Sequence, residues 1–234
     1  MTAEMMRRRR AWLFWGVAGL AILAFVPRSY RTVALIGDSA ELVTAAALWG
    51  VPHPPGYALF TLLGHIFARL PWFELPFRVH LTSAIFHAVA AGIVACTIDI
   101  VTGSLAGAIA GAAALILGRA FLLGSLYAEV FPLNDLFFAW LLFLGIRIAG
   151  GPKAAPSHGA AGPGTAVALG FSLAHHPMIV LGLPAVAILV GPSLAREVRA
   201  RPGRAGGLAA LALAIVATFC ALLPIAASRD PLLS

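Results

Sequence analysis

Charged residues are scarce in this sequence. Asp, Glu, Lys and Arg make up 11% of the 234 residues, whereas 61% of the residues are apolar; soluble domains have about 25% charged residues. A water-soluble protein of this size could not cover its surface with so few charges. A bilayer solvates an apolar exterior, and helices satisfy their own backbone hydrogen bonds there. The composition therefore predicts an all-α, polytopic integral membrane protein.

Several signals of other protein classes are missing. The two cysteines, Cys96 and Cys220, lie inside apolar segments, so neither a disulfide framework nor a cysteine metal site is predicted. The sequence has no phosphate loop, no Gly-x-Gly-x-x-Gly, no serine nucleophile elbow and no His-Glu-x-x-His motif, which disfavours soluble nucleotide-dependent chemistry. The net charge of +7 does not indicate nucleic acid, because the basic residues form short clusters between apolar runs.

The apolar runs predict one transmembrane domain over residues 1–234. The predicted spans are 11–26, 79–98, 104–118, 131–149 and 206–226, with 165–190 as a hairpin broken at His175-His176-Pro177. The run after Arg7–Arg10 could be a signal peptide, but no small-x-small cleavage site precedes Pro27. We therefore expect a retained helix.

The distribution of basic residues predicts the orientation. Arg7–Arg10 and the arginines between the last two apolar segments are expected in the cytoplasm, because basic residues favour that side. The loop 27–78 then lies outside, with two helices at the membrane surface over 39–49 and 57–70. The expected location is a bacterial inner membrane, with the N-terminus cytoplasmic and an active site on the periplasmic side.

The first candidate site residues are Asp38 and Glu41. An acidic residue followed three positions later by Glu, before an apolar helical run, is a capping-box pattern. The alternative is a catalytic carboxylate at the start of an outer helix. The two interpretations are compatible, because a capping Asp keeps a second oxygen for a substrate proton.

Three histidines are further candidates. His53 lies in the turn Val51-Pro52-His53-Pro54-Pro55-Gly56-Tyr57, where a rigid loop could position it toward a phosphate or a sugar hydroxyl. His175 and His176 interrupt an apolar segment, which predicts a polar cavity or a helix break. Since adjacent helical positions point about 100° apart, we expect one functional and one structural histidine. His80 and His87 are predicted to form hydrogen bonds in the core.

These motifs resemble a known family. The stretches Gly37–Leu42 and Gly50–Tyr57, then Ala128-Glu129-Val130, Asn134 and Leu173–His176, are similar to membrane proteins long described as a domain of unknown function. That family includes animal O-mannosyltransferases of the plexin-modifying type and bacterial relatives, and it resembles a branch of the GT-C glycosyltransferases. The resemblance covers about residues 28–190 and implies a GT-C-like helical bundle.

The resemblance implies sugar transfer from a polyprenyl-phosphate donor to an acceptor hydroxyl on the non-cytoplasmic face. Asp38 matches the expected catalytic position, Glu41 supports it or caps the helix, and Tyr57 and Glu129 are outer-face candidates. His53, His175, His176 and Arg229 would bind the donor. No cofactor is required and no metal site is predicted, although a divalent ion is compatible with the chemistry.

The expected partners are the lipid-linked donor, a protein or glycan acceptor and membrane lipids, without nucleic acid. Two other functions stay open. A lipid-carrier transporter or flippase would use the same histidines to bind phosphate, but the sequence lacks the internal repeat common in transporters. A non-catalytic membrane subunit, or a fragment of a longer chain, would also fit the short sequence.

Overall fold

The structure is a computed structural model that describes residues 2–150 and 162–228. The described residues are helical, without strands, so the predicted all-α fold is confirmed. The elements are, in chain order, α1 (Ala3–Phe25), η1 (Val26–Arg28), α2 (Ser39–Leu48), α3 (Ala58–Ala68), α4 (Leu75–Thr102), α5 (Leu105–Leu117), α6 (Arg119–Gly124), α7 (Phe131–Ala149), α8 (Pro163–His175), η2 (Pro177–Gly182), α9 (Leu183–Ala200) and α10 (Pro202–Ala227).

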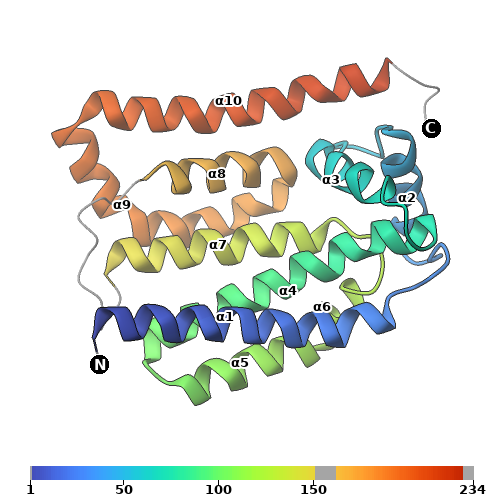
Figure 1. Cartoon of the computed structure of the whole chain (residues 1–234). Helices are drawn as coiled ribbons and strands as arrows, with labels where there is room; N and C mark the ends of the chain where they lie inside the picture. The colour runs from blue at the N-terminus through green and yellow to red at the C-terminus, as the bar shows by residue number, and fades with distance from the viewer. Residues whose placement is uncertain (1, 151–161, 229–234) are drawn as a thin grey trace.

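The bundle is built around one row of helices. In Figure 1, α10, α8, α7, α4 and α1 follow one another from top to bottom, and each packs on the next. Among the described residues, five segments are long and apolar enough to cross a membrane: Ala3–Arg28, Leu75–Thr102, Phe131–Ala149, Pro177–Ala200 and Pro202–Ala227. The chain is thus a polytopic membrane protein by the length and composition of its helices.

Several helix bounds differ from the predicted spans. The predicted span 104–118 contains α5, whose 13 residues reach only about 20 Å at 1.5 Å per residue, and the short α6 follows it. In the predicted hairpin 165–190, α8 ends at His175 and α9 continues to Ala200. α7 covers the same residues as its predicted span. Residues 151–161, most of the connection between the predicted spans 131–149 and 165–190, lie outside the described residues.

α1 and α4 are joined by charge and by close packing. The Asp99 carboxylate, 2% exposed, accepts hydrogen bonds from the side chains of Arg9 and Arg10, the latter at 3.0 Å. A Cβ on Gly92 would lie 3.0 Å from the Phe14 backbone oxygen, so glycine permits this approach. The first helix is therefore fixed along its length against the centre of the bundle.

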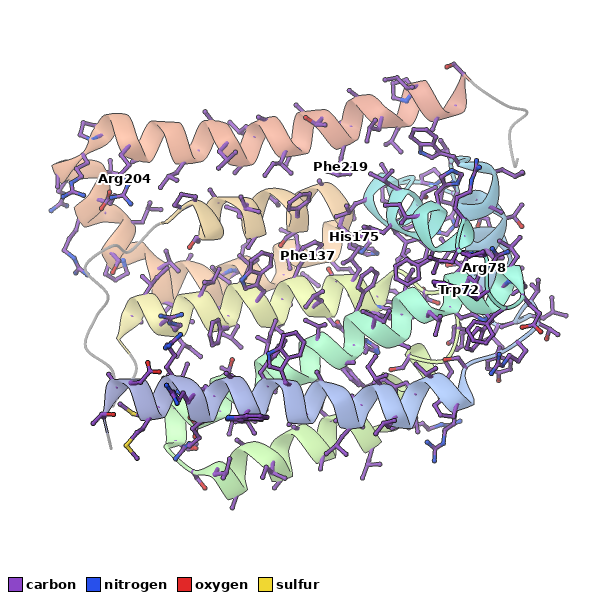
Figure 2. All side chains as sticks on the ribbon, viewed as in Figure 1. Trp72, Arg78, Phe137, His175, Arg204 and Phe219 are labelled. Atoms are coloured by element: carbon purple, nitrogen blue, oxygen red, sulfur yellow. The ribbon has the colours of Figure 1, made fainter. Side chains whose placement is uncertain are left out.

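The short helices α2 and α3 lie at one end of the bundle. Figure 1 shows them opposite the N-terminus and the α9–α10 turn. Figure 2 labels Trp72 and Arg78 near α2 and α3, and Arg204 at the other end. The loop predicted outside and the arginine-rich segment predicted inside thus lie at opposite ends of the bundle, and which end faces the cytoplasm stays a prediction.

An apolar core supports this end. Phe137 of α7 stacks on Phe171 of α8, which meets Phe219 of α10 edge to face. Phe60 of α3 and Leu42 of α2 belong to the same buried cluster. α3 thus packs on α4, α8 and α10, and α2 packs on α3 and α4; Figure 2 shows Phe137, His175 and Phe219 gathered beside this end.

Candidate functional site

The turn before α2 presents Asp38 without a capping bond. Gly37 has a φ of +53°, a conformation that L side chains disfavour, and Asp38 follows at the N-cap position. The Asp38 side chain makes no cap hydrogen bond, and its carboxylate is half exposed. Glu41 does not reach back to the N-cap either, so the predicted capping box is wrong. The Glu41 carboxylate instead accepts hydrogen bonds from another segment.

That segment is the loop between α2 and α3. Glu41 Oε1 accepts the backbone N–H of His53 at 2.6 Å, and Glu41 Oε2 pairs with His53 Nδ1 at 2.7 Å. The loop starts and ends at residues in left-handed conformations, Trp49 (φ +53°) and Tyr57 (φ +40°). Such strain, in residues other than glycine, persists where the surroundings over-determine the backbone. Glu41 and these two turns together fix the His53 ring.

The other edge of the His53 ring faces Asp38. His53 Nε2 lies 3.7 Å from Asp38 Oδ2 and 3.4 Å from the Tyr57 hydroxyl. Asp38, Glu41 and His53 each offer a ligand atom, and these atoms lie within 4.8 Å of one another. The sequence predicted no metal site, because two residues at the start of a helix and one in the loop after it do not show a ligand spacing. The structure brings them into one group.

Glu129 completes the cluster from the opposite side. Its carboxylate approaches the turn at Gly37, where an added Cβ would lie 3.5 Å from Glu129 Oε2. Glu129 is 8% exposed, and its Oε1 accepts the backbone N–H of Val130 at 3.2 Å. The backbone N–H of Glu129 donates to the Ser83 hydroxyl of α4 at 3.1 Å. The start of α7 is thereby positioned beside the start of α2.

The two adjacent histidines have different surroundings. His175, at the end of α8, pairs through Nε2 with the Val130 carbonyl at 2.9 Å, while its buried Nδ1 has no partner among the described residues. His176 accepts the N–H of Met178 on Nδ1 at 3.0 Å, and its ring stacks on Tyr57 with centroids 5.5 Å apart. His175 thus contacts the backbone at the start of α7, whereas His176 packs on Tyr57; the expected split into one structural and one functional histidine stays a prediction.

The electrostatics of the cluster follow from its carboxylates. The hydrogen bond with Glu41 raises the pKa of the His53 imidazole, burial opposes this, and the charges of Asp38 and Glu129 add to it. Burial raises the pKa of Glu129, and the nearby charge of Asp38 raises it further. Burial also raises the pKa of the Tyr57 hydroxyl. The site thus favours positive charge and disfavours further negative charge.

Sequence reasoning found most of these residues but not the partners of His80 and His87. The predicted set of Asp38, Glu41, His53, Tyr57, Glu129, His175 and His176 comes together, whereas Arg229 lies outside the described residues. His80 pairs with the Tyr30 carbonyl at 2.9 Å and with the Ser39 hydroxyl at 3.4 Å, beside Asp38. His87 pairs with Ser125 and Asp135. Core hydrogen bonding by His80 and His87 is confirmed, but their partners had no sequence signal.

A comparison with known families identifies the chain. Residues 38–197, which include all seven clustered residues, match the N-terminal domain of protein O-mannosyl-transferase TMEM260. The match covers more than half of the chain. The chain belongs to this family. The resemblance inferred from the motifs is therefore confirmed at the level of the family.

Individual relatives agree with this assignment. Protein O-mannosyl-transferase TMEM260 of Mus musculus is 41% identical over 146 residues, which cover 62% of this chain and 21% of the mouse protein. The protein O-mannosyl-transferase tmem260 of Dictyostelium discoideum is 29% identical over 113 residues, or 47% of this chain and 14% of that protein. The chain thus spans a small part of the length of these relatives. No solved structure matches the chain.

Proposed function

We propose that this chain carries the catalytic site of a membrane mannosyltransferase, which moves a mannose from a polyprenyl-phosphate donor to a protein hydroxyl. The relatives named as protein O-mannosyl-transferases support the reaction and the protein acceptor. The observation that carries the catalytic assignment is the Asp38 carboxylate. It is half exposed, has no cap hydrogen bond and faces His53 beside two other carboxylates.

The proposed chemistry is a single displacement. The acceptor hydroxyl oxygen attacks the anomeric carbon, and the bond from that carbon to the donor phosphate breaks with its electron pair on the phosphate oxygen. Asp38 accepts the hydroxyl proton. The products are the O-mannosylated acceptor, with inverted configuration, and the polyprenyl phosphate. A positioned general base typically contributes about 10²–10⁴-fold to such a reaction.

The other residues of the cluster have supporting roles in this proposal. Glu41 holds His53 through two hydrogen bonds, so the imidazole is oriented before any substrate arrives. His176, stacked on Tyr57, keeps Nε2 available because Nδ1 accepts the Met178 N–H. Charged or N–H donor groups near the leaving phosphate stabilise the charge that develops there. We assign the N–H donor role to His176. His175, which pairs with the Val130 carbonyl, holds the contact between α7 and α8.

The arrangement of the bundle supports a site on the non-cytoplasmic side. The cluster lies at the end opposite the N-terminus and the arginine-rich α9–α10 turn (Figures 1 and 2). With these basic segments in the cytoplasm, Asp38 faces the other compartment. A lipid-linked donor would reach it from the membrane beside α2 and α3. The bacterial inner membrane stays a prediction from the sequence.

The test is transfer of radiolabelled mannose from polyprenyl-phosphate mannose to membrane-protein acceptors by the purified chain. We expect label to move with the wild type and a loss of at least about 10²-fold in Asp38→Asn. Glu74→Gln, an exposed carboxylate of the same outer loop, is the matched control and should keep full transfer. If Asp38→Asn, folded by circular dichroism, transfers as well as the wild type, Asp38 is not the base.

A further inference from the structure

The cluster holds more negative charge than its positive groups balance. Asp38 Oδ2 lies 3.7 Å and Glu41 Oε2 lies 2.7 Å from nitrogens of the His53 ring, and the Glu129 carboxylate lies beside Gly37, the residue before Asp38. In the described part of the chain, no arginine or lysine lies within 4.0 Å of these carboxylates in an ion pair. Even with His53 protonated, the group carries an excess of negative charge.

This charge conflicts with the donor that the proposed function requires. A phosphate brought next to like charges in a partly buried site is repelled. A cation bound at these carboxylates would offset this repulsion when the donor binds. Metal ions commonly meet this need, because they bind carboxylates on one side and phosphate oxygens on the other.

The geometry of His53 fits a metal ligand. A metal-bound histidine usually donates its other ring N–H to a carboxylate, which fixes the tautomer and the ring orientation. Glu41 binds Nδ1 at 2.7 Å and the backbone N–H of the same residue at 2.6 Å. The remaining nitrogen, Nε2, is left 3.7 Å from Asp38 Oδ2. With ligand bonds of about 2.0–2.2 Å, two ligands on one ion lie about 3 Å apart, so a small side-chain rotation closes the site.

We propose that Asp38 Oδ2 and His53 Nε2 bind one divalent metal ion, that Glu41 orients the imidazole, and that the ion receives the donor phosphate. The binding of the donor phosphate by the ion rests on the proposed function, whereas the metal site itself does not. A carboxylate and an imidazole suit first-row ions such as Mn²⁺ and Zn²⁺. With two ligands from the protein, the ion keeps open positions for water and phosphate oxygens. Asp38 Oδ1 stays available for the acceptor proton.

The test uses Mn²⁺ alone as the probe, because its binding is measured without any reaction. The purified full chain in detergent is stripped with EDTA and titrated with Mn²⁺, and the free ion is followed by its electron paramagnetic resonance signal. We expect saturable binding of one ion per chain. Asp38→Asn and His53→Gln each remove a ligand and should weaken binding at least tenfold, and Glu41→Gln should weaken it about 10–100-fold.

A matched control and a second readout keep the outcomes distinct. Glu74→Gln removes an outer-loop carboxylate paired with Arg31 at 3.9 Å and should bind Mn²⁺ like the wild type; circular dichroism checks that every variant is folded. No saturable binding by the wild type, or equal binding by folded Asp38→Asn and His53→Gln, overturns the metal site. Binding that depends on these residues, without mannose transfer, supports the metal site and contradicts the proposed function. Transfer that persists in EDTA-stripped protein overturns the role of the ion.

Discussion

The Glu41 carboxylate accepts two hydrogen bonds from one residue, His53, through its backbone N–H at 2.6 Å and its Nδ1 at 2.7 Å. The two residues belong to α2 and to the loop after it, so the pair fixes the loop to the helix. Because Nδ1 is bound to Glu41, the Nε2 edge of the imidazole points toward Asp38. The arrangement makes Glu41 a positioning residue for the site.

We expect Glu41 and His53 to act as one unit in transfer. Glu41→Gln removes the charge that orients the imidazole, and loss of such a supporting carboxylate lowers activity about 10–100-fold. Once His53→Gln has removed the ring, Glu41→Gln should add little, because residues in direct contact are not additive. Measured kcat values for the two single variants and the double variant check this. Losses that simply multiply would show that the residues act independently.

The Asp99 ion pairs are expected to stabilise the bundle far from the site. Asp99→Asn removes a buried charge that pairs with the partly exposed Arg9 and Arg10. Breaking a buried pair costs about 3–5 kcal/mol, and the exposure of the arginines places this case at the low end. The unfolding temperature in detergent should fall, while Mn²⁺ affinity of the folded protein is unchanged.

Glu4→Gln is the control for Asp99→Asn. Glu4 forms ion pairs with Arg7 and Arg8 on the exposed surface of the same helix, and exposed pairs contribute little. Its unfolding temperature should match the wild type. An equal decrease for the two variants would mean that the general charge of α1, rather than the contact with α4, determines stability.

Close packing of α2 on α3 should be needed to keep Glu41 in contact with His53. A Cβ on Gly64 of α3 would lie 2.9 Å from the Ala46 Cβ of α2, so Gly64→Ala forces the two helices apart. Overpacking of this kind costs about 1–3 kcal/mol, and it should also weaken Mn²⁺ binding by displacing Glu41 from His53. Gly16→Ala, with nothing within 4 Å of the added Cβ, should leave both quantities intact. Tight binding in Gly64→Ala would separate helix packing from the site.

The orientation of the chain is testable by cysteine labelling. In a Cys96→Ala, Cys220→Ala background, single substitutions Trp72→Cys and Arg199→Cys place thiols near the two opposite ends of the bundle. A membrane-impermeant maleimide added to sealed vesicles or cells should label Trp72→Cys from the non-cytoplasmic side and Arg199→Cys only after permeabilisation. Labelling of both from one side would contradict the arrangement.

Much of the fold and several candidate site residues were predictable from local sequence. The rarity of charge determined that the exterior meets lipid, because water cannot solvate such a surface. The helix break at His175 and His176 was visible in an apolar run that contains two imidazoles and Pro177. The family motifs also predicted Asp38, His53 and Glu129 as candidate site residues, and the fold brings them close together. Each of these predictions needs only neighbouring residues or their spacing.

The tertiary structure decided which of these residues act together. The sequence pattern favoured Glu41 as a cap of its own helix. In the structure the loop after α2 folds back toward the start of α2, and the Glu41 carboxylate hydrogen-bonds to His53 instead. Glu129 and His176, distant in sequence, reach the same place because α4, α7 and α8 pack in one row. Local patterns determine where the helices form and whether lipid or water surrounds them. The net charge and ligand geometry of the site depend on long-range packing, which no local pattern contains.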